Sequence, residues 1–144
     1  MMINIHVNNL YQDFSFKSSS IEKISKEVLI DSDYNNVDLN FIFCDDLKLN
    51  ALKIEYFNED VLTDVLTFPL RDDTVLESEI YISVDRAIDN AKENNVTLEN
   101  EIMRLIIHSL LHLLGYKDDN KESKEAMFLK QENYIKQLST IKIL

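Results

Sequence analysis

The segment that decides the fold is EIMRLIIHSLLHLLGYKDD, residues 101–119. Between positions 102 and 114 every residue except Arg104, His108, Ser109 and His112 is apolar, which is typical of a helix buried at the centre of a domain. His108 and His112 interrupt this pattern four positions apart, so they lie one above the other on the same helix face. Gly115, the only glycine of the chain, predicts a left-handed residue that ends the helix and turns the chain back.

An acidic residue follows this turn at a defined distance. Asp118 lies three positions beyond Gly115, where its carboxylate can reach the same ion as the two imidazoles. The pattern H-x-x-x-H-x-x-G-x-x-D offers two nitrogen ligands and one oxygen ligand, and it leaves a fourth position for water. We therefore predict a metal site formed by His108, His112 and Asp118. The alternative is a pair of core histidines that are hydrogen-bonded and hold no ion.

The same spacing occurs in metzincin peptidases, where a third histidine stands in place of Asp118. In those enzymes a glutamate directly follows the first histidine and acts as the general base. Ser109 occupies that position here, and a hydroxyl group cannot accept a proton efficiently at neutral pH. The pattern therefore favours a metal site and argues against a peptidase.

The rest of the chain reads as alternating strands and helices. Strands are predicted around residues 3–7, 37–43, 64–70 and 79–84, and helices around 19–29, 46–56, 85–95, 97–114 and 122–138. This order, β-α-β-α-β-β-α-α-α, favours a mixed sheet with helices packed on it.

Polar residues and a proline mark where these elements begin and end. Ser19 with Glu22 matches a capping box, and Asp45 or Asp46 is expected to cap the second helix. Thr97 is expected to cap the long helix. Pro69 is expected to end its strand or to lie on the edge of the sheet.

Composition limits the class of protein. The formal net charge is −11, which argues against a large surface that grips nucleic acid regardless of sequence. From Lys117 onward there are six lysines and five acidic residues, whereas residues 1–116 carry nine basic and 21 acidic residues. Cys44 is expected to be a buried free thiol and His6 a surface residue. We find no signal peptide and no membrane-spanning segment, so a cytoplasmic location is expected.

Three sequence blocks together resemble the YbeY-type endoribonucleases, also called ribosomal RNA maturation factors. The family signature H-G-x-L-H-L-x-G-Y-D-H stands here as HSLLHLLGYKD, residues 108–118. The block T-D-V-L-S-F-P appears as TDVLTFP at 63–69, and G-D-I-x-I-S appears as SEIYIS at 78–83. The distances between the blocks and the total length also match, so the resemblance covers nearly the whole chain.

The resemblance implies an α/β (α+β) fold in a single domain over residues 1–144. The implied sheet is mixed, mostly parallel and four-stranded, and it is packed with about five helices. The implied zinc site lies at the C-terminal end of the central helix. The family's first two histidine ligands carry over to His108 and His112, and the third carries over to Asp118, which is still an acceptable zinc ligand. Ser109 replaces a family glycine and Lys117 a family aspartate.

One further departure concerns contact with phosphate. The family has an arginine shortly before the T-D-V-L block, and the aligned residue here is Phe57. Arg71 and Arg104 are the nearest candidates to replace it. For each of them a structural salt bridge is the alternative role.

The activity implied by the resemblance is zinc-dependent, single-strand-specific cleavage of RNA in small-subunit ribosomal RNA maturation and ribosome quality control. The expected cofactor is one Zn²⁺, and the expected partners are ribosomal RNA and the small ribosomal subunit, with no DNA and no membrane. Two alternatives stay open: a ribosome assembly factor whose zinc is mainly structural, and a metal-dependent hydrolase of another substrate.

The absence of a glutamate at position 109 gives a first prediction. Casein and short peptides should not be cleaved when zinc is present, because the general base of a peptidase is missing. A fluorescent casein assay measures this directly. Metal-dependent proteolysis that disappears in His112→Ala would contradict the nuclease interpretation.

Overall fold

Four strands form one mixed sheet in the computed structural model, which describes residues 1–144. The strands are β1 (Met2–Asn9), β2 (Asn36–Cys44), β3 (Val65–Asp72) and β4 (Val75–Ser83). Their spatial order is β1-β2-β4-β3, with β1 parallel to β2 and β2 parallel to β4. The edge strand β3 runs antiparallel to β4. The predicted mixed, mostly parallel sheet is confirmed.

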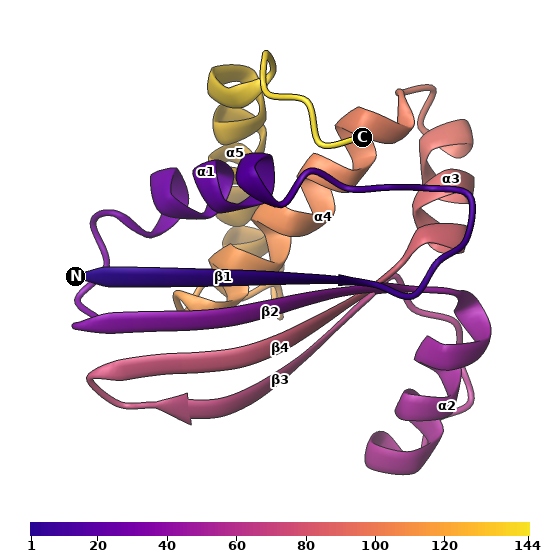
Figure 1. Cartoon of the computed structure of the whole chain (residues 1–144), viewed down its shortest axis with the longest axis horizontal. Helices are drawn as coiled ribbons and strands as arrows, with labels where there is room; N and C mark the ends of the chain where they lie inside the picture. The colour runs from indigo at the N-terminus through magenta and orange to yellow at the C-terminus, as the bar shows by residue number, and fades with distance from the viewer.

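Five helices complete the fold: α1 (Ser18–Leu29), α2 (Asp46–Phe57), α3 (Val84–Glu93), α4 (Leu98–Leu113) and α5 (Lys121–Leu138). Figure 1 shows α1, α4 and α5 on one side of the sheet and α2 on the other. The order of elements is the predicted one. No helix has both the length and the apolar character needed to cross a membrane.

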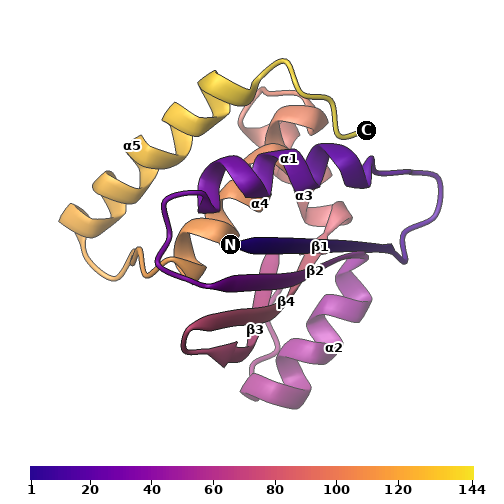
Figure 2. The ribbon, with the colours of Figure 1, turned by 60° about the vertical axis from the view of Figure 1, so that its left-hand side comes forward.

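The main core lies between the sheet and a group of helices to which α4 belongs. Alternate residues of β2 point into it, and Val37, Leu39, Phe41 and Phe43 are fully buried. α4 contacts α1, α3, α5 and β3, so it is central to the packing. In Figure 2, α5 lies outside α4 as the outermost helix.

A smaller cluster under α2 includes Cys44, which is buried as predicted, and burial raises the pKa of its thiol to about 12.

Two of the predicted helix caps are confirmed. The Asp45 carboxylate accepts a hydrogen bond from the backbone N–H of Lys48 at 2.8 Å, and the Thr97 hydroxyl accepts one from Asn100 at 3.0 Å. Pro69 lies in the edge strand, next to a break in the register between Pro69 and Arg71. Proline has no backbone N–H, and at such an edge position its absence removes the fewest hydrogen bonds between strands.

The predicted capping box of α1 is wrong. The helix begins at Ser18, its N-cap residue is Lys17, and no side chain caps it. Glu22 instead pairs with Lys26 at 2.8 Å along the helix surface. The start of α1 is held by the C-terminal segment, because the backbone N–H of Lys17 donates to the carbonyl of Ile143 at 2.6 Å.

Glu99 has a structural role that its sequence position alone does not reveal. Its carboxylate accepts hydrogen bonds from the backbone N–H groups of Ile143 and Leu144. Ile143 is fully buried in the main core. The carboxylate thus fastens the C-terminal segment over α1 and the start of α4, where Figure 1 places the end of the chain.

Gly115 ends α4 as predicted, with φ of +99°. Its backbone N–H donates to the carbonyl of His112, and the N–H of Tyr116 donates to the carbonyl of Leu111, both at 3.0 Å. These two bonds form a Schellman motif, which satisfies carbonyls at the helix end and reverses the chain direction. A Cβ at position 115 would meet no atom within 4 Å, so only the backbone conformation demands glycine there.

The conformation of Gly115 gives a prediction for stability. Gly115→Val should lower the free energy of unfolding by about 1–2 kcal/mol, because a β-branched residue is strained at positive φ. Urea unfolding with a chelator present measures the loss free of any metal contribution. Gly115→Asn should lose less, since asparagine tolerates left-handed backbone. Equal losses in the two variants would contradict this explanation.

Candidate metal centre

The last two turns of α4 bring two imidazoles together. His108 and His112 lie on one face of the helix, and their Nε2 atoms are 3.1 Å apart. The rings are nearly perpendicular, with their centroids 4.6 Å apart. The helix backbone fixes this spacing, because residues four positions apart are neighbours along its surface.

The loop after Gly115 brings the third side chain to the same point. The Asp118 Oδ2 atom lies 3.5 Å from His112 Nε2 and 4.0 Å from His108 Nε2. Each of the three residues offers one ligand atom, and these atoms lie within 4.8 Å of one another. The structure therefore places the three predicted ligands together, and the group could hold a metal ion. That each of them binds one remains a prediction.

The outer nitrogen of each ring has its own partner. The Nδ1–H group of His112 donates to the backbone carbonyl of Tyr116 at 3.1 Å. Because a carbonyl can only accept, this contact leaves the lone pair of the neutral His112 ring on Nε2. His108 Nδ1 lies 2.7 Å from Oε1 of Gln131 on α5. Both Nε2 atoms thus point inward, toward Asp118.

The donor set fits a divalent cation. Two nitrogen atoms and a carboxylate oxygen converge on one point, and a cation placed there would be attractive to all three. The side chains of His108, His112 and Asp118 are 34%, 33% and 46% exposed, so the point is open to solvent. Among His, Cys, Asp and Glu residues no fourth one joins the group.

Arg104 does not point freely into this space. Its guanidinium group pairs with Glu132 through Nε and Nη2 at 3.0 and 2.9 Å, and with Glu101 through Nη1 at 3.2 Å. The hydrogen bonds to Glu132 are the main cause of the raised pKa of Arg104. Burial raises the pKa of Glu101, and the contact with Arg104 opposes that shift. Of the two roles considered for Arg104, the geometry supports the structural salt bridge.

The contacts of Arg71 and Phe57 are with residues other than the three candidate ligands. Arg71 Nε donates to the Asp73 carboxylate at 3.0 Å, and its side chain is half exposed. Phe57 ends α2 and is 45% exposed, with its ring 5.8 Å from that of Phe68. The position aligned with the family arginine therefore belongs to an aromatic cluster on the α2 side of the sheet.

His6 is outside the site, as predicted. It lies on β1 with its side chain 61% exposed, and its Nε2 is 3.3 Å from the Asp38 carboxylate. It therefore provides a matched control for experiments on the other two histidines.

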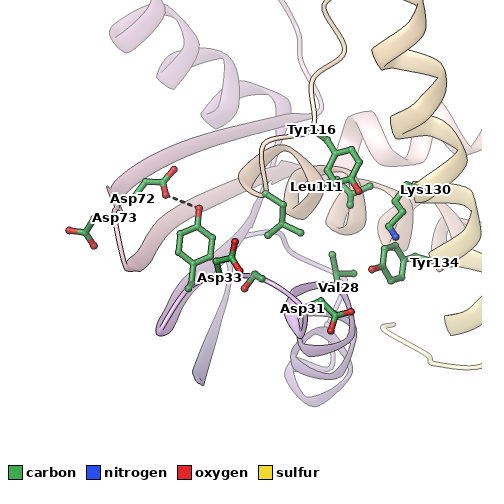
Figure 3. A pocket seen from close by; sticks show the side chains of 12 residues that line it. Val28, Asp31, Asp33, Asp72, Asp73, Leu111, Tyr116, Lys130 and Tyr134 are labelled. Atoms are coloured by element: carbon green, nitrogen blue, oxygen red, sulfur yellow. Dashed lines mark hydrogen bonds between the residues drawn. The ribbon is translucent and has the colours of Figure 1, made fainter.

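A pocket rich in carboxylates lies against the C-terminal end of α4 and the side of α5 (Figure 3). It has a volume of about 500 Å³, and its lining includes Asp31, Asp33, Asp72 and Asp73 but none of the three candidate ligands. The Tyr34 hydroxyl donates to Asp72 at 2.7 Å, and burial together with this bond raises its pKa to about 12. The four carboxylates outnumber the single cation of the lining, Lys130, so the pocket disfavours phosphate.

Gln131 is the contact of the site that the sequence analysis missed. It is only 5% exposed and lies on the inward stripe of α5. A polar residue midway between buried Met127 and Ile135 was the available signal, because all three share one helix face at i, i+4 spacing.

Comparison with known proteins agrees with this architecture. A family model described as endoribonuclease YbeY matches residues 6–139. The chain belongs to this family. Endoribonuclease YbeY of Karelsulcia muelleri is 36% identical over 137 residues, which cover 93% of this chain and 94% of the relative. The corresponding protein of Flavobacterium johnsoniae is 38% identical over 108 residues, which cover 75% of this chain and 78% of the relative.

A solved structure shares the fold. The solution structure of TM1509 from Thermotoga maritima superposes with a TM-score of 0.64 at 29% identity, covering 93% of this chain and 88% of that one. The family resemblance drawn from three motifs is therefore confirmed. Two of these motifs, residues 63–69 and 78–83, lie largely in the paired strands β3 and β4.

The geometry predicts which residues hold an ion. Purified protein should contain about one zinc-sized ion per chain, and His108→Ala and His112→Ala should each lose most of it, because two remaining ligands hold zinc poorly. Inductively coupled plasma mass spectrometry measures the content. His6→Ala should keep its metal. Undiminished metal in both ligand variants would contradict the assignment.

Proposed function

We propose that the protein is a zinc-dependent endoribonuclease that cleaves single-stranded RNA during maturation of small-subunit ribosomal RNA and in ribosome quality control. Membership of the endoribonuclease YbeY family supports the activity. The proposed partners are ribosomal RNA and the small ribosomal subunit, and the proposed location is the cytoplasm.

The observation that carries the proposal is an open three-ligand group. Structural zinc sites are closed by four protein ligands, whereas catalytic sites use three and keep one position for water or substrate. Here the group contains His108, His112 and Asp118 only, and each side chain is a third to a half exposed. This favours catalysis over the alternative of an assembly factor with a mainly structural zinc.

The chemistry of the ligands favours zinc as the ion. Two imidazoles and one carboxylate suit Zn²⁺, and an ion bound there supplies a Lewis acid that activates water and stabilises negative charge on a phosphoryl oxygen. The roles of His108 and His112 are to hold the ion through Nε2. Asp118 contributes a negative charge, so the loaded site is less positive than one built from three imidazoles.

Exposed lysines are the cations available to contact phosphate near this site. Arg104 is occupied by Glu132 and Glu101. Lys117 adjoins Asp118 in the loop, and Lys121 and Lys124 follow on the first turn of α5, all three exposed. They belong to the part of the chain with a slight excess of basic residues.

A cleavage assay tests the proposal. Metal-loaded protein should cut a labelled single-stranded RNA, and should leave a duplex RNA and the DNA of the same sequence intact. His112→Ala should slow cleavage by about 100-fold or more, because a bound metal contributes several kcal/mol to stabilising the transition state. His6→Ala should cut at the wild-type rate, and Asp118→His should retain metal and activity.

Three outcomes separate this proposal from its alternatives. Full metal content without RNA cleavage would favour the assembly factor. Cleavage that survives in His112→Ala would exclude this site as the catalytic one. Metal-dependent hydrolysis of a small phosphodiester with no action on any RNA would favour another substrate.

A further inference from the structure

The two imidazoles of the metal site are oriented by different parts of the molecule. His112 is held by the backbone of its own loop, through the carbonyl of Tyr116. His108 is held by a side chain of another helix, Gln131 of α5. A side-chain amide can present either oxygen or N–H, so something must fix which of them faces His108.

Arg104 and Glu132 begin the chain of contacts that fixes this choice. A guanidinium group can only donate, and Arg104 donates to both oxygens of the Glu132 carboxylate at 3.0 and 2.9 Å. The same contact is the first cause of the lowered pKa of Glu132. Glu132 therefore stays ionised and can only accept hydrogen bonds.

Glu132 in turn fixes the amide of Gln131. The Gln131 Nε2 atom lies 3.2 Å from Glu132 Oε2, and only an N–H group can face a carboxylate at that distance. The opposite end of the amide, Oε1, then faces His108 Nδ1 at 2.7 Å. Because Gln131 is 5% exposed, water cannot readily take over its contacts.

The amide oxygen finally fixes the tautomer of His108. It can only accept, so Nδ1 of His108 must carry a hydrogen, and in the neutral imidazole that binds a metal the lone pair is then on Nε2. That lone pair points toward His112 and Asp118. Each hydrogen bond in the chain from Arg104 to His108 has one possible direction.

We infer that Gln131 is a positioning residue of the metal site, which sets the tautomer and ring orientation of His108 and thereby links α5 to metal affinity. Arg104 and Glu132 serve the same end by orienting Gln131. The inference rests on the metal site that the proposed function uses, but it concerns the preorganisation of that site before any ion or RNA binds.

The test compares two variants of Gln131. One can accept a hydrogen bond from Nδ1 of His108 and the other cannot. Gln131→Met keeps the length of the side chain but cannot fix the imidazole, so zinc affinity should fall about 10–100-fold. Gln131→Glu still presents an acceptor oxygen to Nδ1, whether its carboxyl group is ionised or donates a shared proton to Glu132, so it should preserve the tautomer and bind zinc about tenfold or more tightly than Gln131→Met. Gln137→Met, an exposed change on the same helix, should match the wild type.

Two readouts are independent of RNA cleavage. Competition with a chromophoric chelator gives the dissociation constant for zinc. In the metal-free protein, ¹⁵N NMR of the ring nitrogens reports which one carries the hydrogen. We expect His108 to be Nδ1–H in the wild type and in Gln131→Glu, and to shift toward Nε2–H in Gln131→Met. His112 should not change in any variant.

The outcomes distinguish this inference from the proposed function. If Gln131→Met keeps both wild-type zinc affinity and the Nδ1–H tautomer, Gln131 does not position His108. If Gln131→Met does not fold, the test rests on Gln131→Glu. An Nε2–H tautomer of His108 or a loss of zinc in that variant would also show that Gln131 does not position His108. Wild-type protein that binds no zinc but shows the expected tautomer supports the positioning role and contradicts the proposed function.

Discussion

The burial of α4 is the constraint on which the rest of the structure depends. The helix contacts three other helices and the edge strand, so its axis and rotation are fixed by apolar packing on most sides. Beyond its first turn only one narrow stripe is left partly exposed, and Arg104, His108 and His112 occupy it. Gly115 then ends the helix, and the loop that follows returns Asp118 to that stripe. Packing that serves stability thus also fixes two of the three ligand positions.

What the sequence could predict is what neighbouring residues determine among themselves. The element order, the caps at Asp45 and Thr97 and the left-handed Gly115 follow from periodicity and short-range hydrogen bonding, and all are present. The grouping of His108, His112 and Asp118 could be anticipated because one helix and one turn contain all three. The capping box at Ser19 failed for a non-local reason: the C-terminal segment holds the start of α1.

Contacts between distant segments could not be predicted in this way. Glu99 accepts from residues 143 and 144, and Arg104 pairs with Glu132 across 28 positions. An arginine near a candidate site can face substrate or an acidic residue from another helix, and sequence spacing does not discriminate between them. The position of the Glu132 carboxylate in the fold decides between these two roles. Pairing with it avoids the free-energy cost of leaving the charge of a partly buried guanidinium group desolvated.

The charge of the site connects these observations to the acidic character of the chain. A carboxylate ligand at Asp118 would lower the net charge of a loaded site, and the pocket at the end of α4 adds four carboxylates against one lysine, Lys130. Long-range attraction of a polyanion is therefore weak on most of the surface. Under the proposed function, affinity for RNA would come from close contacts near the candidate metal site, where a bound ion and the exposed lysines of the loop and α5 would be the local positive charges. Because Gln131 of α5 contacts His108, an RNA strand that contacts the first turn of α5 would touch the helix that we propose orients this imidazole. The edge of the molecule formed by the Asp118 loop and α5 is consequently where metal affinity and RNA binding are expected to depend on each other.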